Sequence, residues 1–187
     1  MVLVIAAAHA QPPLHSPACI FNGAVLHDKS GATIDGCSVL ANHSVALYFA
    51  GEWCPLCRRF TPALREFHRQ DKDTSSIVFV SSDASREDAT THFANSLHSD
   101  GIFQVGWESD LAASLKRKHR VWSGREIGTY GPNRRSGVPC VVVIDSAGEE
   151  LTFLGGERYG AAALRESWNP STIARACSVA CPRARQG

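Results

Sequence analysis

The sequence has no surplus of charge of either sign and no long apolar run. Its 187 residues carry 19 lysines and arginines against 18 aspartates and glutamates, which gives a formal net charge of +1. This balance excludes a chain-wide electrostatic attraction to nucleic acid or to anionic lipid. The apolar stretch at residues 1–8 is far shorter than the ~20 residues that a membrane span needs. We therefore expect no nucleic-acid partner and no membrane partner.

The sequence also lacks the even cysteine count of a disulfide-rich secreted domain. It has seven cysteines, so at least one thiol stays unpaired in a monomer. This number favours a reducing compartment, and we expect the cytoplasm, with an organelle or the nucleus as alternatives. Residues 1–10 resemble a short secretory signal ending in Ala-His-Ala, but they lack a positively charged segment beyond the amino terminus. Secretion is the competing interpretation.

Length and composition favour one globular domain, because 44% of the residues are hydrophobic and 20% are charged. We expect a flexible arm (1–17), a domain (18–170) and a C-terminal helix and tail (171–187). Apolar runs alternate with helical periodicity along this domain, which predicts an α/β fold with a mixed central sheet flanked by helices. The predicted strands are 45–50, 77–80, 138–144 and 149–154, with an N-terminal β-hairpin from 20–26 and 33–40. The predicted helices start near 58, 86 and 111, the last capped by Asp110, with short ones at 159–168 and 171–177.

Residues 121–137 show no apolar periodicity and contain five glycines or prolines and three arginines. A segment of this kind is typically a functional loop or a disordered insertion. It leads directly into Val138 and Pro139, so we expect it to border the active site. Arg125, Arg134 and Arg135 could then contact carboxylates of a substrate or an electron donor.

The strongest chemical signal is Trp53-Cys54-Pro55-Leu56-Cys57, which follows a buried strand and begins a helix. Unpaired backbone N–H groups at a helix start stabilise a thiolate, so Cys54 is expected to have the lower thiol pKa. Cys57 lies one turn farther and could resolve a mixed disulfide. Two alternatives stay open: a zinc site completed by Cys177 and Cys181, and a pair of buried structural cysteines.

Residues 45–67, reading VALYFAGEWCPLCRRFTPALREF, resemble the tryparedoxin and nucleoredoxin branch of the thioredoxin-like superfamily. The run Phe60-Thr61-Pro62-Ala63-Leu64, the segment 80–83 and the segment 137–139 occur in the order of that family. The resemblance covers roughly residues 21–153. It implies a thioredoxin fold, a cis bond before Pro139, and reduction of protein disulfides with Cys54 as nucleophile and Cys57 as resolving thiol.

The resemblance also implies the partners of the site. Trp53, Pro55, Val138 and Pro139 would contact the substrate, and the backbone of Val138 would pair with an extended chain. The expected substrates are disulfide-containing proteins, among them peroxiredoxin-type peroxidases. A low-molecular-weight thiol or a reductase would supply electrons, and no bound cofactor or metal is expected.

The chain departs from the family pattern at four places, one of them an altered tryptophan-containing segment at 105–107. Leu56 stands where tryparedoxins usually carry a second proline, which affects the reduction potential. Tyr48 occupies the place of a buried acid in thioredoxins proper and removes that proton acceptor. The segment 122–136 is longer than the family's short link. One alternative function is a redox-regulated protein-binding module with little turnover. A second, weaker alternative is a zinc-binding protein that uses the same cysteines. Cys140 is expected to be a buried strand residue, and the histidines to be surface residues.

Overall fold

The computed structural model describes residues 20–40, 43–145, 148–156, 160 and 163–168. The expected arm (1–17), the expected tail (171–187) and Cys177 and Cys181 lie outside these residues. Within the described part, the elements alternate between strands and helices, as the apolar runs predict.

Seven strands form one mixed sheet in the order β2-β1-β5-β4-β3-β6-β7. The centre is parallel, with β3 (Ser44–Ala50) beside β4 (Ser75–Ser81) and β4 beside β5 (Ile102–Val105). Antiparallel strands extend both sides: β6 (Cys140–Ile144) and β7 (Glu150–Gly155) beyond β3, β1 (Val25–His27) and β2 (Thr33–Asp35) beyond β5. Every residue of β3, β4 and β6 is buried, which explains the continuous apolar runs 45–50, 77–80 and 140–144 within them. The predicted mixed sheet is confirmed.

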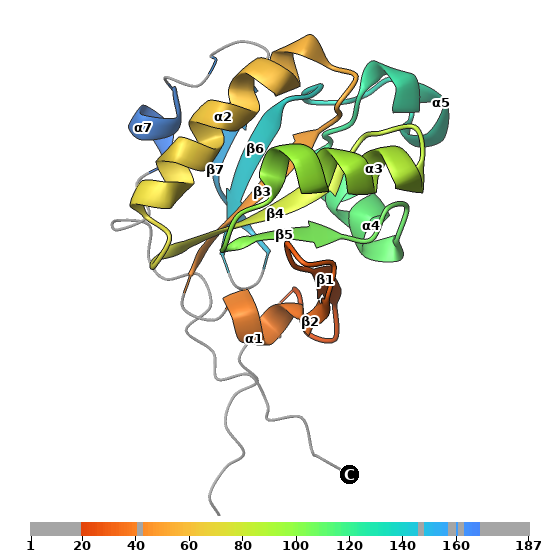
Figure 1. Ribbon diagram of the computed structural model, residues 1–187. Helices are drawn as coiled ribbons and strands as arrows, with labels where there is room; N and C mark the ends of the chain where they lie inside the picture. The colour runs from red at the N-terminus through yellow and green to blue at the C-terminus, as the bar shows by residue number, and fades with distance from the viewer. Residues whose placement is uncertain (1–19, 41–42, 146–147, 157–159, 161–162, 169–187) are drawn as a thin grey trace, which may run out of the picture.

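Helices cover this sheet. In Figure 1, α2 (Pro55–Gln70) and α3 (Arg86–His92) cross in front of the strands, while α4 (Asp110–His119) and α5 (Ile127–Tyr130) lie to the right. The apolar face of α2, with Phe60, Leu64 and Phe67, is buried in the core. A π-helical turn η1 (Phe93–Leu97) continues α3, and α7 (Ala163–Ser167) lies near α2.

Two local expectations were wrong, and one strand was not expected. Residues 36–40 form a helix, α1 (Gly36–Leu40), and not strand, because the Asp35 carboxylate accepts the backbone N–H of Ser38 (2.9 Å) and begins a helical turn. Strand β5 was not predicted, because it is short and contains Gln104. Ser109, and not Asp110, caps α4, with its hydroxyl accepting the N–H of Ala112 (3.2 Å).

The cysteines of the described residues differ in state. Cys54, Cys57 and Cys140 form no disulfide and are all buried, so the expected burial of Cys140 in its strand is confirmed. Cys37 is disulfide-bonded. None of the helices in the described part of the chain combines the length and apolar character needed to span a bilayer.

Candidate active site

Cys54 lies where the central strand β3 gives way to α2. It has an extended backbone (φ −87°, ψ 113°) and is the residue that caps the helix, while Pro55 is the first helical residue. Proline fits there because the N–H it lacks would have no partner within the helix. The Cys54 sulfur accepts the backbone N–H of Cys57 at 3.4 Å. The sequence therefore places this sulfur against the positive end of a helix that runs to Gln70.

Cys57 lies on the inner side of the same turn. Its side chain is fully buried, whereas that of Cys54 keeps 5% of its surface exposed. Burial raises the pKa of the Cys57 thiol well above its usual value, and the hydrogen-bonded Cys54 adds to the increase. The structure thus brings the two cysteines together as the motif predicts and makes them chemically unequal.

The segment before β6 faces Cys54 from across the site. The Val138–Pro139 peptide bond is cis, as expected. The Cys54 thiol donates a hydrogen bond to the carbonyl oxygen of Val138 at 3.6 Å. In the described part of the chain, the backbone N–H of Val138 donates to no group. This backbone edge beside the sulfur is available to an extended peptide.

The side chain of Trp53, the first residue of the motif, is held by contacts to two other segments. Its indole N–H donates to the carbonyl oxygen of Ser82 at 2.9 Å. Gly51 permits this position, because a Cβ there would lie 2.5 Å from the indole nitrogen. The guanidinium carbon of Arg125 lies 4.1 Å from the centre of the Trp53 ring, a cation–π contact.

Residues 121–137 border the site and are more regular than their sequence suggests. They contain a 3-10 turn, η2 (Gly124–Glu126), followed by α5. One wall of a groove of about 330 Å³ comes from this segment and the other from the cysteine motif. We call it the Cys54 groove; its lining is Trp53, Cys54, Pro55, Leu56, Ser123, Gly124, Arg125, Arg134 and Val138.

The three arginines of this segment do not share one environment. Arg125 and Arg134 line the Cys54 groove. Arg135 instead forms an ion pair with Glu150 at 2.6 Å and stacks over Phe153, with 3.5 Å from its guanidinium carbon to the ring centre. The structure therefore places two of the three predicted arginines beside Cys54.

Lys116 of α4 attaches the segment to the sheet. Its buried ammonium donates to the carbonyl oxygen of Ser81, at the end of β4, at 2.6 Å and forms an ion pair with Glu126. Burial opposes ionisation of Glu126, but the charge of Lys116 and its hydrogen bond more than offset this, so the pKa of Glu126 is lowered. The basic run at 116–120 is typical of a solvated helix end, but Lys116 and His119 are both buried.

A buried polar cluster behind Trp53 was not predicted. The Asp83 carboxylate accepts the N–H of Glu52 (2.7 Å), the hydroxyl of Ser81 (2.8 Å) and the Nδ1 of His92 (3.0 Å). Burial opposes the ionisation of Asp83, but these hydrogen bonds prevail and its pKa is lowered. The other ring nitrogen of His92 lies 3.5 Å from a carboxylate oxygen of Glu52. His92 is buried, as is His68, so the expectation that the histidines are surface residues was wrong for them.

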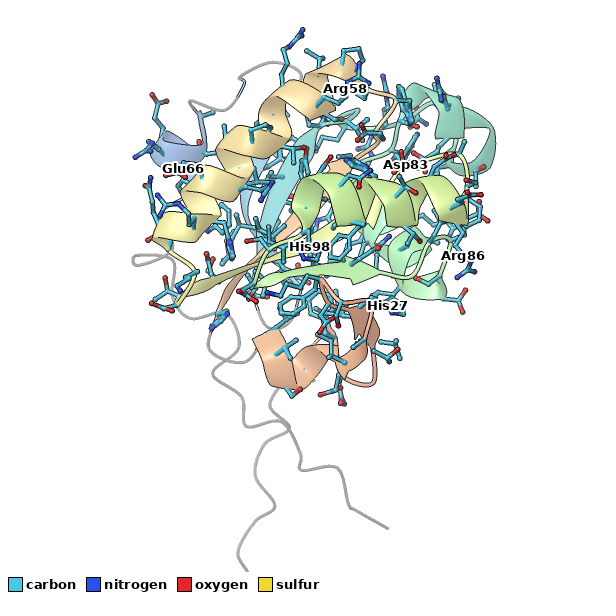
Figure 2. The ribbon with its side chains drawn as sticks, viewed as in Figure 1. His27, Arg58, Glu66, Asp83, Arg86 and His98 are labelled. Carbon is cyan, nitrogen blue, oxygen red and sulfur yellow. The ribbon has the colours of Figure 1, made fainter. Side chains whose placement is uncertain are left out.

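Figure 2 labels Asp83 of this cluster, which is drawn near α3. Arg58 lies at the upper end of α2, in its first turn, and Glu66 lies toward the other end of that helix. Arg58 contacts the residue that precedes the cysteine motif, because its guanidinium donates to the carbonyl oxygen of Glu52 at 2.7 Å.

Tyr48 of β3 lies near Cys57, at the position where thioredoxins proper have a buried acid that can accept a proton. The Thr61 hydroxyl donates to the carbonyl oxygen of Cys57 (2.9 Å), so the Tyr48 hydroxyl must be the donor in its 2.8 Å bond to Thr61. Burial raises the pKa of Tyr48 far above its usual value. The Tyr48 hydroxyl is therefore a neutral donor committed to Thr61.

Among the described residues, no three His, Cys, Asp or Glu side chains are grouped so that they could hold a metal ion. Cys177 and Cys181, which the zinc alternative requires, lie outside the described part of the chain.

A family model described as thioredoxin-like matches residues 42–150, which contain both cysteines and the cis-proline. The chain belongs to the thioredoxin-like family. Its relatives place it in the tryparedoxin and nucleoredoxin branch, as the residues around the motif indicated.

Three relatives show the extent of the similarity. Mouse (Mus musculus) nucleoredoxin is 29% identical over 130 residues, 68% of this chain and 26% of that protein. Probable nucleoredoxin 1 of Arabidopsis thaliana is 34% identical over 125 residues, 63% of this chain and 18% of that protein. Tryparedoxin of Trypanosoma brucei brucei is 38% identical over 65 residues, 34% of this chain and 44% of that protein. The chain thus spans about a quarter of the length of the animal nucleoredoxins it matches.

Solved structures share the fold. A thioredoxin from Wuchereria bancrofti superposes with a TM-score of 0.61 at 34% identity, over 83% of this chain and 95% of the other. Tryparedoxin II from C. fasciculata superposes with a TM-score of 0.56 at 21% identity, over 80% of this chain and 84% of the other. The thioredoxin-like family and its fold are thus established for this chain.

Proposed function

We propose that this chain is a thiol-disulfide oxidoreductase that reduces protein disulfides with Cys54 as nucleophile and Cys57 as resolving thiol. The observation that carries the proposal is the asymmetry of the pair. Cys54 caps a helix and keeps 5% of its surface exposed beside a groove, whereas Cys57 is fully buried and has a raised pKa.

The reaction takes two exchanges. The Cys54 thiolate attacks one sulfur of the substrate disulfide, an S–S bond forms to Cys54, and the other substrate sulfur leaves as a thiolate. The Cys57 thiolate then attacks the Cys54 sulfur, which releases the second substrate thiol and leaves a Cys54–Cys57 disulfide. An external dithiol or a reductase returns the pair to the reduced state. Trp53, Pro55 and the edge of Val138 and Pro139 would hold the substrate chain against Cys54.

Candidate substrates are disulfide-containing proteins, including peroxiredoxin-type peroxidases, which the branch implies. We also propose a cytoplasmic location. The disulfide at Cys37 is more typical of an oxidising compartment. Fractionation of cells combined with the redox state of Cys37 would decide between the two.

The test is trapping with single-cysteine variants. Cys54→Ser should abolish reduction of insulin disulfides, because a hydroxyl cannot replace a thiolate at neutral pH. Cys57→Ser should still attack and should accumulate a mixed disulfide through Cys54, visible by mass spectrometry. In the reduced wild-type protein, Cys54 should react with iodoacetamide before Cys57, since Cys57 is buried and its pKa is raised.

Other outcomes would contradict the assignment. Substantial turnover by Cys54→Ser, or alkylation of Cys57 first, would exclude Cys54 as the nucleophile. Redox-dependent partner binding without insulin turnover would favour a binding module, and stoichiometric zinc in protein purified without added metal would favour a zinc protein. Cys140→Ser is a matched control, because Cys140 is a buried thiol of the neighbouring strand outside the motif.

A further inference from the structure

The Cys54 groove has an apolar floor and a cationic wall. Trp53, Leu56 and Val138 supply the floor, and Leu56 leaves 39% of its surface exposed. Arg125 and Arg134 form the wall. A volume of about 330 Å³ admits a few side chains of an extended peptide and not a folded domain. Whatever occupies this groove lies directly beside the attacking sulfur.

The charge of the wall is not neutralised within the described residues. Arg125 is exposed, stacks on Trp53, and forms no ion pair there, so the edge of its guanidinium keeps its N–H groups. Arg134 donates one N–H to the carbonyl oxygen of Trp122 (3.1 Å), a neutral acceptor that fixes the side chain without cancelling its charge. The charge of Arg135, by contrast, is neutralised by its ion pair with Glu150.

Acidic groups lie on the far side of Arg125 and Trp53. A second cavity of about 280 Å³ is lined by Glu52, Asp83 and Asp88, with Arg125 and Trp53 between it and the Cys54 groove. A carboxylate on an incoming chain is repelled by this acidic cavity and attracted by the Cys54 groove. The carboxylates of the second cavity weaken this attraction, but none of them lines the Cys54 groove, whose charged lining residues are the two arginines.

We propose that the Cys54 groove selects disulfide substrates whose reacting cysteine has a carboxylate one or two residues away. This inference rests on the proposed function and adds a substrate class to it. The segment 121–137 acts as the selecting wall: Arg125 and Arg134 pair with the carboxylate while Val138 pairs with the backbone. The guanidinium edge suits a carboxylate because it can donate two parallel hydrogen bonds.

The experiment uses three peptides that differ at one position beside a single cysteine: Glu, Gln or Lys. Each cysteine carries a 2-thiopyridyl group, a neutral leaving group. Cys54 attacks the peptide sulfur, the bond to the thiopyridyl sulfur breaks, and pyridine-2-thione leaves and is measured by absorbance. The protein is the full chain, reduced beforehand with dithiothreitol that is then removed.

We expect the Glu peptide to react about five-fold faster than the Gln peptide, which is the order that two exposed charge pairs contribute. The Lys peptide should be the slowest. Raising the salt to ~1 M, where the screening length is ~3 Å, should bring the rates together. The double variant Arg125→Gln/Arg134→Gln should abolish the preference, and Arg125→Glu should reverse it toward Lys. The matched control is Arg135→Gln, which removes the same charge from the same segment and should keep the wild-type ratio.

The outcomes separate the two proposals. If the wild-type protein reacts with none of the peptides, the thiol-disulfide function itself fails. If it reacts with all three at equal rates, the function stands and the selecting wall is overturned. A preference that survives in the double variant, or that disappears in Arg135→Gln, also overturns it.

Discussion

The buried ion pair between Lys116 and Glu126 allows a quantitative test of how the wall is held. Lys116 keeps 7% of its side chain exposed and Glu126 keeps 18%. Replacing Lys116 by Met fills the same space but leaves a buried carboxylate without its cation and the Ser81 carbonyl without its donor. Breaking a buried pair on one side typically costs about 3–5 kcal/mol. We expect Lys116→Met to lower the free energy of unfolding by about that amount at pH 7.

The pH dependence gives this prediction a distinct signature. In the wild-type protein the pKa of Glu126 is lowered, so its ionised form stabilises the fold above the usual carboxyl pKa, and this stability is lost as the pH falls. In Lys116→Met the burial of Glu126 acts without the cation, so we expect the pKa of Glu126 to be raised. The free energy of unfolding of the variant should then be higher at low pH and should fall as the pH rises. The deficit relative to wild type should therefore shrink from pH 7 toward pH 4.

The assay is urea unfolding at both pH values, followed by circular dichroism. Lys118→Met is the matched control, because Lys118 lies on the same helix and pairs with Glu149 at 2.8 Å while 35% and 69% of the two side chains are exposed. Such an exposed pair contributes less than about 1 kcal/mol. The double variant Lys116→Met/Glu126→Gln should recover part of the lost free energy of unfolding, because no unpaired charge is left. Equal losses in the two single variants, or a deficit independent of pH, would refute the reasoning.

Two further predictions concern residues around the cysteines. Gly51→Ala should displace the Trp53 indole from the Ser82 carbonyl, lower stability by about 1–3 kcal/mol and shift the tryptophan emission. Gly128→Ala, where a Cβ meets nothing within 4 Å, should leave both unchanged, and equal effects would contradict the steric argument. Tyr48→Phe should cost about 1 kcal/mol in urea unfolding for the lost hydrogen bond to Thr61. It should leave the pH profile of insulin reduction unchanged, whereas a shifted profile would show that the hydroxyl takes part in proton transfer.

Much of the fold could be predicted because the central strands are buried on both faces. Both faces of such strands pack in the core, so their central residues are apolar, and the runs at 45–50, 77–80 and 140–144 stand out in the sequence. Strand β5 could not be recognised in this way, because four residues with a glutamine give too weak a pattern. For residues 36–40, the β-branched neighbours favour a strand in the sequence. The structure has a helix there because the Asp35 side chain caps its first turn.

The cysteines of the site could be predicted for a different reason. Their spacing, the proline between them and the strand before them are all local, and so is the proline at 139. The cluster of Glu52, Asp83 and His92 joins three separate segments, so no local pattern reveals it. Arg125 and Arg135 look alike in the sequence, but only the tertiary structure turns one toward Trp53 and the other toward Glu150.

The topology explains why distant segments meet at one edge of the sheet. Strands β3 and β4 are parallel, so the motif that follows β3 and the Asp83 that follows β4 leave the sheet at the same end. Strand β6 is antiparallel to β3, and Cys140 pairs with Phe49, so the start of β6 lies beside the end of β3. Any residues placed just before β6 must therefore arrive next to the cysteine motif. A segment inserted before Pro139 is thus placed against Cys54 by strand direction alone, and Lys116 then attaches it to the end of β4.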